Sequence, residues 1–502
     1  MRLPRPESFI TVAPCLLVIF FVLKASVSGI WIVRPWDVPD EIGHFSYIKD
    51  LAVGNGIPVL DETKMDADAW SHFARNTDAA PDKNWIAQHP PLYHVLMVPV
   101  YWLGALFGST LWGSFYLIRL ATACLFGLGI LVMVKAFRAA GLSASVSLGL
   151  GLIMASIPNH TYLAGAVNHD ALVFLFGSLV LYYWVRFSKS SRNYDLTRLG
   201  IVLGLGGLVK YTFLVLLPPV VLLVGAVMWR DRKVSMNQVA TFLGLTFVPI
   251  LAWMLRNWIL VGEGLPIDTS GFQSSHPLAV GWLEFGRSFP VLSIITRSYW
   301  GLLGWQGDGL LQVRWLQIYS IYQQAYSWPV VILLALTSFY LAKDSLKNQR
   351  YLSYGVCGVL VAVLGFVSIG WWEKELWFYL PLFFLGIAIL GWRIAEGCCQ
   401  IQSRSWGTIQ MAEIGAVVVF FFFLIIHLSK VYAYSLPSGV LQGTFGRYYL
   451  PVVGFLFLGF FGKGLRSFPL RAPLVMGIAI LYACVELYVW LHEAIPFFYV
   501  HA

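Results

Sequence analysis

Apolar stretches of about twenty residues, the length that an α-helix needs to cross a bilayer, recur along the chain between shorter polar segments. The pattern predicts membrane helices in thirteen stretches: 11–33, 114–134, 147–166, 170–186, 198–210, 211–229, 239–261, 328–342, 351–370, 377–392, 409–430, 448–462 and 472–492. We therefore expect an all-α polytopic membrane protein in which residues 1–502 form a single integral membrane domain. An alternative for the first stretch is a signal peptide cleaved near residues 25–29.

Two long polar segments interrupt this pattern, at 34–113 and 262–327. Within the first segment, residues 92–107 are apolar, but counting them as a span breaks the alternation of basic loops across the membrane. We therefore interpret them as an interfacial helix that begins after Pro90 and Pro91. Both long segments are expected to carry juxtamembrane helices on the same face of the membrane.

The composition supports a membrane protein, because 58% of the residues are hydrophobic and only 12% are charged. A soluble domain carries roughly 25% charged residues, so the sequence excludes a soluble enzyme, a disordered scaffold and a nucleic-acid binder. Seven short segments hold 19 of the 34 basic residues and only five acids: 1–10, 135–145, 186–200, 230–238, 343–350, 393–408 and 463–471. They fall on one side of the predicted helices, which places them and the N-terminus in the cytoplasm. The net charge of +9 thus indicates the orientation of a multi-pass protein of the cell inner (plasma) membrane, with both long loops facing outward.

The first outer loop is acidic, with ten acids and five basic residues in 34–89. Pro39 suits the first position of a short helix, which places Asp40 and Glu41 in its first turn and His44 one turn later. A carboxylate kept ionised by a helix N-terminus can accept a proton from an attacking hydroxyl or amine. Acids in a first turn also complement the helix dipole, so a purely structural interpretation stays open beside the catalytic one.

Several basic residues lie where the membrane is predicted, at or inside apolar spans: Lys24, Arg119, Lys210, Arg256, Lys430 and Arg447. Burying such a charge costs at least ~2.5–3.5 kcal/mol, which makes a functional role the first hypothesis. All except Lys24 map to outer halves or outer ends and predict a site for an anionic, lipid-linked ligand such as a phosphate. Snorkelling to the headgroups is the alternative for Lys24 and Lys430.

Other polar and aromatic residues map to the same face. Asn168 and Asp170 lie in a turn between two predicted spans, where Asn168 would alternatively cap the following helix. The 262–327 loop is rich in Trp and Tyr, including Trp300, whose rings either stack on sugars or form an interfacial aromatic belt. No second acidic cluster completes a metal site, so no metal ligands or other cofactors are assigned and a divalent metal is not supported by the sequence.

The motifs resemble the GT-C superfamily of membrane glycosyltransferases. Asp40-Glu41 after the first helix looks like the acidic motif of their first outer loop. Asp-Glu-x-x-His-Phe followed by His89-Pro-Pro-Leu is similar to protein O-mannosyltransferases. The order of Pro-Pro-Leu-Tyr, Arg119, Lys210 and a late outer arginine resembles the lipid A aminoarabinose transferases. The likeness is nearest to a bacterial branch of polytopic proteins known as a domain of unknown function, through six motifs in order: Pro39-Asp-Glu-x-x-His-Phe, His89-Pro-Pro-Leu-Tyr, Asn168-x-Asp-Ala-Leu, Arg256-Asn-Trp, Ser298-Tyr-Trp-Gly-x-x-Gly-Trp and Gly446-Arg-Tyr-x-Leu-Pro.

The resemblance implies a GT-C-like fold and transfer of a hexose or pentose, with inversion, from a polyprenyl-phosphate donor to a glycan, lipid or protein acceptor on the outer side. It implies Asp40 as the general base, with Glu41 assisting or orienting it. The donor phosphate and the substrate would be held by His44, His89, Arg119, Asn168, Asp170, Lys210, Arg256, Trp300, Arg447 and Tyr448. No large soluble domain follows the last predicted helix, which is a departure from the oligosaccharyltransferases.

Two other functions fit the same residues. A flippase or transporter of lipid-linked saccharides would use the cations to guide the phosphate, although transporters often show internal repeats and this chain shows none. A glycan ligase or polymerase with a diphosphate-linked donor would need the same base and phosphate site. In each case the partners are membrane lipids and a polyprenyl-linked saccharide, and no nucleic acid is expected.

Overall fold

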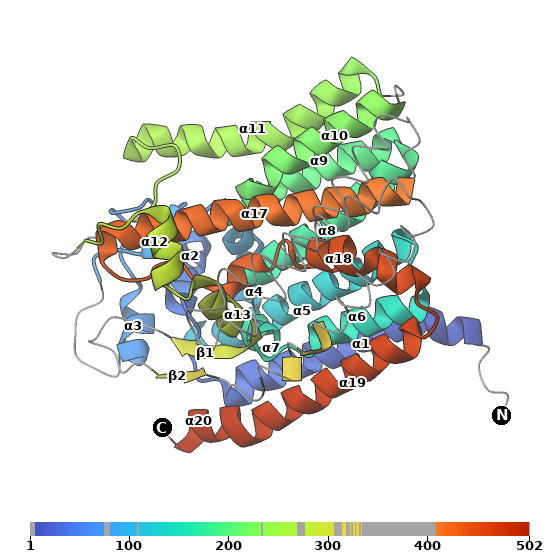
Figure 1. Cartoon of the computed structure of the whole chain (residues 1–502). Helices are drawn as coiled ribbons and strands as arrows, with labels where there is room; N and C mark the ends of the chain where they lie inside the picture. Colours follow the sequence, from blue (N-terminus) through green and yellow to red (C-terminus); the bar gives the residue numbers. More distant parts are fainter. Residues whose placement is uncertain are drawn as a thin grey trace.

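A computed structural model describes residues 6–74, 81–107, 110–231, 234–268, 277–305, 314–317, short pieces between 322 and 333, and 408–500. These residues are mostly helical, with one two-stranded antiparallel sheet in which Leu302 pairs with Gln317. The predicted spans 351–370 and 377–392, and almost all of 328–342, lie outside the described residues. Figure 1 shows the helices as a bundle with the sheet and several short helices gathered at one end.

The first half of the chain, up to the second long loop, forms a series of helices with few breaks. They are α1 (Pro6–Val27), the π-helix η1 (Ser28–Ile32), α2 (Glu41–Val53), α3 (Ala67–Ala74), the 3-10 helix η2 (Trp85–Gln88), α4 (Leu92–Ala105), α5 (Thr110–Ala139), α6 (Ala144–Ala155), α7 (Pro158–Ala164), α8 (Asp170–Ser190), α9 (Asn193–Gly207), the 3-10 helix η3 (Tyr211–Leu216), α10 (Leu217–Asp231) and α11 (Met236–Val261).

The second long loop and the C-terminal part supply the remaining described elements. They are α12 (Trp282–Ser288), α13 (Val291–Gly301), the strands β1 (Leu302–Trp305) and β2 (Arg314–Gln317), α17 (Thr408–Ser438), the 3-10 helix η6 (Gly446–Tyr449), α18 (Val453–Ser467), α19 (Arg471–Val489), the π-helix η7 (Trp490–Ala494) and α20 (Ile495–Val500).

Seven of the described helical segments are long and apolar enough to cross a membrane: Val12–Ile32, Leu111–Ala139, Asp170–Ser190, Tyr211–Asp231, Met236–Val261, Gln410–Ser438 and Arg471–Tyr499. Three other predicted spans are shorter or broken here. The predicted 147–166 span is divided into α6 and α7, because Pro158 cannot continue the hydrogen bonding of a preceding helix and begins a new one. The predicted spans 198–210 and 448–462 correspond to helices of only 15 residues, α9 and α18. The count of thirteen therefore stays a prediction.

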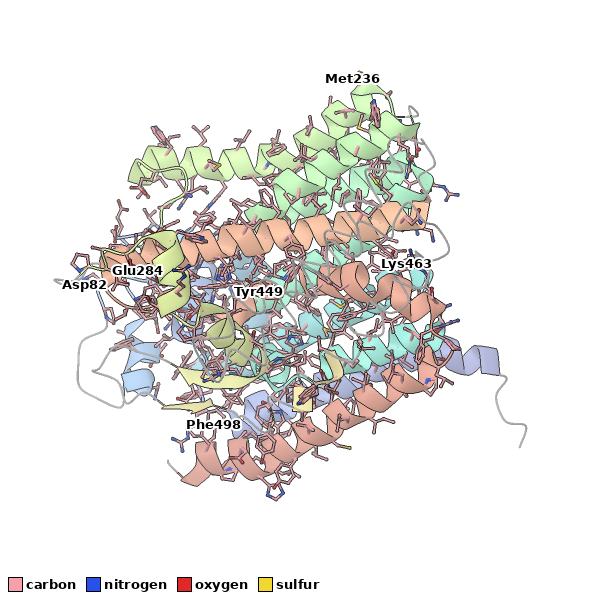
Figure 2. All side chains as sticks on the ribbon, in the orientation of Figure 1. Asp82, Met236, Glu284, Tyr449, Lys463 and Phe498 are labelled. Carbon is pink, nitrogen blue, oxygen red and sulfur yellow. The ribbon has the colours of Figure 1, made fainter. Side chains whose placement is uncertain are left out.

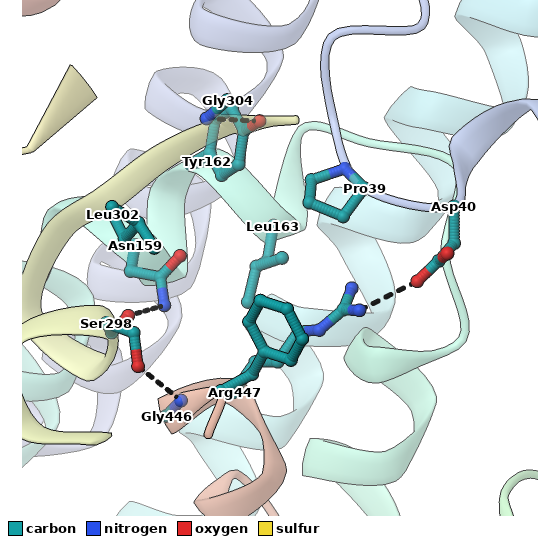
Figure 3. Close-up of a pocket in the computed structure, with 11 residues that line it drawn as sticks. Pro39, Asp40, Asn159, Tyr162, Leu163, Ser298, Leu302, Gly304, Gly446 and Arg447 are labelled. Atoms are coloured by element: carbon teal, nitrogen blue, oxygen red, sulfur yellow. Dashed lines mark hydrogen bonds and ion pairs between the residues drawn. The ribbon is translucent and has the colours of Figure 1, made fainter. Parts of the chain in front are cut away.

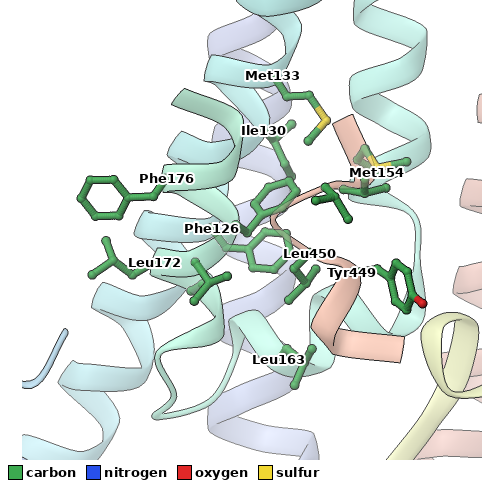
Figure 4. Packing of buried hydrophobic residues seen from close by; sticks show 14 of the residues in the cluster. Phe126, Ile130, Met133, Met154, Leu163, Leu172, Phe176, Tyr449 and Leu450 are labelled. Carbon is green, nitrogen blue, oxygen red and sulfur yellow. The ribbon is translucent and has the colours of Figure 1, made fainter. Parts of the chain in front are cut away.

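The central layer of the bundle is α5, which packs against α8, α4 and α1. Figure 4 shows part of the apolar cluster, with Phe126, Ile130 and Met133 along α5 and Leu172 and Phe176 on α8. The rings of Phe126 and Phe174 stack with their centroids 4.3 Å apart. Stacked aromatic rings bury much apolar surface at a fixed spacing, so α5 and α8 hold one another in register.

A backbone contact between two glycines ties the end of α1 to the turn that precedes α8. A Cβ atom added to Gly165 would lie 2.6 Å from the carbonyl oxygen of Ala25, and one added to Gly29 would overlap the carbonyl of Gly165. Only glycine permits this approach. Residue 40 and residue 170, which follow these two points along the chain, are thereby held at the same end of the bundle.

The helix expected at 92–107 is observed as α4, whose 14 residues are too short to span a bilayer, and its interfacial position stays a prediction. It packs against α5 and α2 at the end that also carries α3 and α13 in Figure 1. Figure 2 places Asp82 and Glu284 at this end and Lys463 at the opposite one. The polar 34–113 segment thus folds over one end of the bundle.

Candidate functional site

A pocket of about 230 Å³ lies where the first polar loop, α7, α13, β1 and η6 meet (Figure 3). Its walls come from four segments that are distant in sequence: Pro39, Asp40, Asn159, Tyr162, Leu163, Ser298, Leu302, Gly304, Phe445, Gly446 and Arg447. Asp40 and Arg447 are the charged residues of this wall. The pocket therefore brings together the first and the last of the six sequence motifs.

Asp40 precedes α2 in a left-handed conformation, with φ at +69°. Its Oδ1 accepts a hydrogen bond of 3.2 Å from the indole nitrogen of Trp85, and its Oδ2 forms an ion pair of 2.7 Å with Nη2 of Arg447. The Asp40 side chain is 27% exposed and that of Arg447 is 11% exposed. The carboxylate thus faces the pocket, is oriented by two donors and stays accessible.

Arg447 is positioned by a close approach of η6 to α13. A Cβ atom on Gly446 would overlap the backbone of Tyr299, so glycine is required there. The Gly446 amide donates a hydrogen bond of 2.6 Å to Oγ of Ser298, and the Asn159 side chain donates one of 2.9 Å to the carbonyl of Ser298. The short helix η6 is therefore fixed to α13, and α13 is fixed to α7.

Behind Arg447 the charges continue into the bundle. Nη1 of Arg447 lies 3.7 Å from Oδ2 of Asp170, whose Oδ1 pairs with Nζ of Lys210 at 2.7 Å. The Nζ atoms of Lys210 and Lys430 lie 5.2 and 5.5 Å from the ring centroid of Tyr448. With Asp40, this group holds three cations and two anions. The surplus positive charge is suited to a bound anion.

Four histidines border this group: His44, His89, His94 and His169. Nδ1 of His44 lies 3.0 Å from Nε2 of His94, and the ring centroid of His169 lies 4.4 Å from that of His44 and 4.7 Å from that of His89. Burial lowers the pKa of His94 to about 3. Burial, and then nearby cations and other histidines, hold the pKa values of the other three well below the ordinary value. The four imidazoles are therefore neutral at pH 7.

Glu41 is adjacent to Asp40 in sequence but has a different environment. It is completely buried and forms an ion pair with Arg119, at 2.6 Å from Nη2 and 2.8 Å from Nε. The backbone amides of Trp36 and Val167 donate to its two oxygens at 2.9 and 2.8 Å. With four donors around it, Glu41 has no oxygen available for a ligand.

The guanidinium of Arg119 also donates to backbone carbonyls of the first loop. It bonds to Gly29, to Val33 at 2.9 Å and to Arg34 at 3.0 Å, and it lies over the ring of Phe115. All of these groups belong to the scaffold around Asp40. Arg119 therefore fastens the first loop to α5, and no donor of it points into the pocket lining.

Three of the other residues expected at the site have partners outside the pocket. The Asn168 side chain donates to the carbonyl of Leu163 and accepts from the amide of Asp170 within its own turn, at 2.8 and 2.9 Å. The N-cap residue of α8 is His169, so Asn168 lies one residue before the position that its capping alternative predicts. Arg256 donates to the carbonyls of Ile57 and Pro58 and is not part of the pocket lining. Trp300 stacks on Tyr326 at 5.3 Å in a separate aromatic cluster.

The residues that the sequence did not single out are His94, Asn159 and Tyr162, and Ser298 stood only as the first residue of a motif. Tyr162 donates a hydrogen bond of 2.6 Å to the carbonyl of Asp37 and accepts one of 2.8 Å from the amide of Gly304, which closes one wall of the pocket. Each of these polar residues lies in or beside an otherwise apolar helix. A buried polar residue in such a helix is the signal that could have identified them.

Unpartnered polar atoms remain in the charged group. Nε of Arg447, Nδ1 of His89 and Nδ1 of His169 have no hydrogen-bond partner among the described residues. Buried donors are nearly always paired, so these atoms indicate room for a ligand or water. Within the same described residues, no three His, Cys, Asp or Glu side chains are arranged to hold a metal ion. The arrangement can bind an anion beside a carboxylate that is free to accept a proton.

Three solved structures are similar to the chain. A Saccharomyces cerevisiae protein O-mannosyltransferase complex, Pmt1-Pmt2 bound to the sugar donor, matches with 18% identity and a TM-score of 0.34 over 52% of this chain and 35% of that one. ArnT from Cupriavidus metallidurans bound to undecaprenyl phosphate matches with 13% identity and a TM-score of 0.39 over 98% of this chain and 85% of that one. The Archaeoglobus fulgidus oligosaccharyltransferase in its apo form matches with 14% identity and a TM-score of 0.34 over 94% and 56%.

The chain thus spans about a third of the mannosyltransferase chain and just over half of the oligosaccharyltransferase. No curated protein matches the sequence. Residues 61–265, which include His89, Arg119, Asp170 and Lys210, match the family described as a predicted membrane protein, DUF2142, and this confirms the expected resemblance over that part of the chain.

Proposed function

We propose that the protein is a membrane glycosyltransferase that moves one sugar from a polyprenyl-phosphate carrier to a hydroxyl or amine acceptor. The observation that carries the proposal is the pairing of Asp40 with Arg447 at the wall of the pocket. It sets a proton acceptor, Asp40, beside a cation, Arg447. Arg447 also lies next to Asp170, which in turn pairs with Lys210. The transfer needs both groups, because one substrate loses a proton while the other leaves as an anion.

In the proposed step, the acceptor oxygen or nitrogen gives its proton to Asp40 and attacks C1 of the sugar. The bond between C1 and the phosphate oxygen breaks, its electron pair stays on the lipid phosphate, and the configuration at C1 inverts. Positioned carboxylate bases contribute typically 10²–10⁴-fold to such reactions. Arg447 would stabilise the charge that develops on the phosphate, since it is already fixed in place by η6 and needs little reorganisation.

The neutral histidines support a phosphate at this position. A neutral imidazole donates one N–H and adds no charge, so the group can surround an anion without further repulsion between cations. Nδ1 of His89 and Nδ1 of His169 are the atoms in question. Lys210 would act on the same phosphate as a point charge. Lys430 and the ring of Tyr448 border the same group from α17 and η6.

Glu41 and Arg119 have a different proposed role, that of positioning residues. Their ion pair joins η1, the first loop, α5 and the turn before α8, all of which carry parts of the site. Because every oxygen of Glu41 is occupied, it would act on Asp40 only through the backbone. The assisting role expected from the sequence is therefore proposed as positioning rather than direct assistance.

The size and location of the pocket favour this function over the alternatives. A cavity of about 230 Å³ is smaller than the ~300–1,000 Å³ of pockets for drug-sized ligands, which suits one sugar ring better than a whole glycan. The pocket lies at one end of the bundle, among the short helices, whereas a transporter needs access from both sides of the membrane. Following the charge pattern of the loops, we further propose that this end faces outward from the cell inner membrane.

The decisive experiment is a transfer assay with the purified full-length protein, presented with synthetic undecaprenyl-phosphate hexoses and pentoses. In Asp40→Asn, we expect transfer to fall by about 10²–10⁴-fold, because the amide cannot accept a proton. Asparagine tolerates the left-handed backbone of residue 40, so the variant should unfold at the temperature of the wild type. Binding of undecaprenyl phosphate should change little.

Asp50→Asn is the matched control, since it makes the same change within α2, the helix that Asp40 precedes, at an exposed bond in which Asp50 accepts from the side chain of Asn55. It should transfer like the wild type. Full activity in Asp40→Asn would refute the assignment of the base. Movement of a labelled polyprenyl saccharide across vesicles without any transfer would favour the transporter instead.

A further inference from the structure

A second cavity, of about 780 Å³, lies at the opposite end of the bundle from the pocket. It is formed near the start of α1, by the last turns of α5, by the start of α6, and by single residues of α8 and α19. The other ends of α1, α5 and α8 lead to residues 40, 119 and 170. The cavity therefore belongs to the other face of the membrane domain and is no part of the site around Asp40.

The cavity has an apolar wall and a basic edge. Leu131, Val134 and Leu148 line it, and Lys135 and Arg138 stand at its side on the last turns of α5. Both cations are exposed. The wall comes partly from α1, α5 and α19, which are candidate membrane spans, so acyl chains of the surrounding leaflet reach it directly.

Lys135 and Arg138 have no carboxylate partner among the described residues. The described acids at this end are paired with other cations: Asp195 with Arg186, Asp231 with Arg230, and Glu413 with Arg466. Lys135 and Arg138 are not needed to satisfy the last carbonyls of α5 either. Lys189 donates to the carbonyl of Ala139 at 2.6 Å and Arg466 to that of Ala140 at 3.2 Å.

We propose that this cavity binds one anionic phospholipid of the adjoining leaflet. The phosphate of the headgroup lies between Lys135 and Arg138, and the acyl chains lie along Leu131, Val134 and Leu148. The charge of the edge selects an anionic headgroup over a zwitterionic one, and the apolar lining, which takes up the acyl chains, distinguishes a retained lipid from general attraction to the membrane surface. The lipid contacts α1, α5, α6 and α19 and so connects these helices at the end of the bundle opposite the site around Asp40.

The test uses the purified full-length protein in detergent, with phosphatidylglycerol or phosphatidylcholine added, and native mass spectrometry to count retained lipids. The wild type should retain one phosphatidylglycerol in preference to phosphatidylcholine. In Lys135→Gln/Arg138→Gln, the preference should weaken by roughly 30-fold, since each Lys or Arg near an anionic headgroup contributes on the order of fivefold. Ser145→Trp, which fills the cavity without changing the charge, should lose the retained lipid as well.

The matched control is Arg192→Gln/Arg198→Gln, which removes the same charge from exposed residues that do not line the cavity. It should keep the preference. Equal retention of both lipids by the wild type, or equal loss in the control and in Lys135→Gln/Arg138→Gln, would overturn the proposal. Millimolar inorganic phosphate should not displace the lipid, and displacement would indicate a soluble phosphate as the ligand. Sugar transfer is not the readout, so the result is independent of the function proposed for Asp40.

Discussion

The ion pairs of Asp40 with Arg447 and of Glu41 with Arg119 begin at neighbouring residues yet differ in almost every physical respect. The first is accessible from the pocket, and its arginine reaches toward a second carboxylate. The second is sealed: both partners are at most 1% exposed, and four donors surround the carboxylate. A pair with accessible atoms can exchange its partner for a substrate, whereas a closed pair can only hold the backbone. The comparison separates chemistry from scaffold within a single acidic motif.

The largest expected effect on stability comes from the closed pair. Glu41→Gln leaves the Arg119 charge buried without a counter-charge, which should lower the free energy of unfolding by about 3–5 kcal/mol. Asp40→Asn, at the open pair, should change it by less than about 1 kcal/mol. Denaturant or thermal unfolding of both variants in detergent measures this difference. Equal stability of the two variants would contradict the division into open and closed pairs.

A smaller effect is expected from Arg447→Lys, which keeps the positive charge but loses the planar fork that reaches both Asp40 and Asp170. One charge-assisted hydrogen bond contributes about 1.5–3 kcal/mol, so kcat/KM for transfer should fall by roughly 10–100-fold. Stability should remain near that of the wild type. If Arg447→Lys instead unfolded the protein, this arginine would belong to the scaffold together with Arg119.

The buried histidines should make the free energy of unfolding depend on pH. An imidazole that stays neutral in the folded protein takes up a proton on unfolding once the pH falls below its unfolded pKa of about 6.5. Stability should thus be complete above that pH and decrease by roughly 1.4 kcal/mol per pH unit for each such histidine as the pH falls. For His94 the decrease continues to its folded pKa of about 3. His94→Gln should show a shallower dependence between pH 6.5 and 4.5 in unfolding measurements, and an unchanged slope would refute the burial of this imidazole.

The smallest effect is expected at Arg256, whose partners are carbonyls of the distant 57–58 segment. Arg256→Gln should leave kcat/KM for transfer within about threefold of the wild type, because a surface substitution away from the site changes interactions by about 0.5 kcal/mol. The same assay as for Arg447→Lys provides the measurement. A loss of kcat/KM as large as that in Arg447→Lys would support the original expectation that Arg256 binds the donor.

The membrane class could be predicted from the sequence, and so could the grouping of Asp40, Asp170, Lys210 and Arg447 at one end of the bundle. Hydropathy and charge patterns extend over stretches of many residues, which makes them visible in a sequence. The roles of single charges could not be predicted. The sequence predicts Asp40 and Glu41 in one helix turn, whereas in the structure Asp40 precedes α2 in a left-handed conformation and Glu41 begins the helix. Only the three-dimensional position of Arg119, 78 residues from Glu41, decides that Glu41 is enclosed. The sequence leaves Asn168 open as a cap or a ligand, and in the structure its side chain bonds within its own turn, to the Leu163 carbonyl and the Asp170 amide.

The histidine group illustrates the same limit. His44 and His89 stood beside recognisable motifs, whereas His94 lay unremarked in the apolar stretch that became α4. Its partner Tyr47 stacks on it with ring centroids 3.8 Å apart, which no spacing along the chain indicates. Contacts of this kind depend on how α2 and α4 cross. A sequence pattern predicts that each helix exists but not the angle at which the two meet.

The contact of Gly29 with Gly165 has a consequence for engineering. Because the backbones touch there, the loop that carries Asp40 and the turn that carries Asp170 behave as one module with a fixed offset. A first loop transplanted from a related chain would fit only if the 165–170 turn were transplanted with it. Directed evolution of this protein should therefore recombine the two segments as a linked block, although about 130 residues of chain separate them.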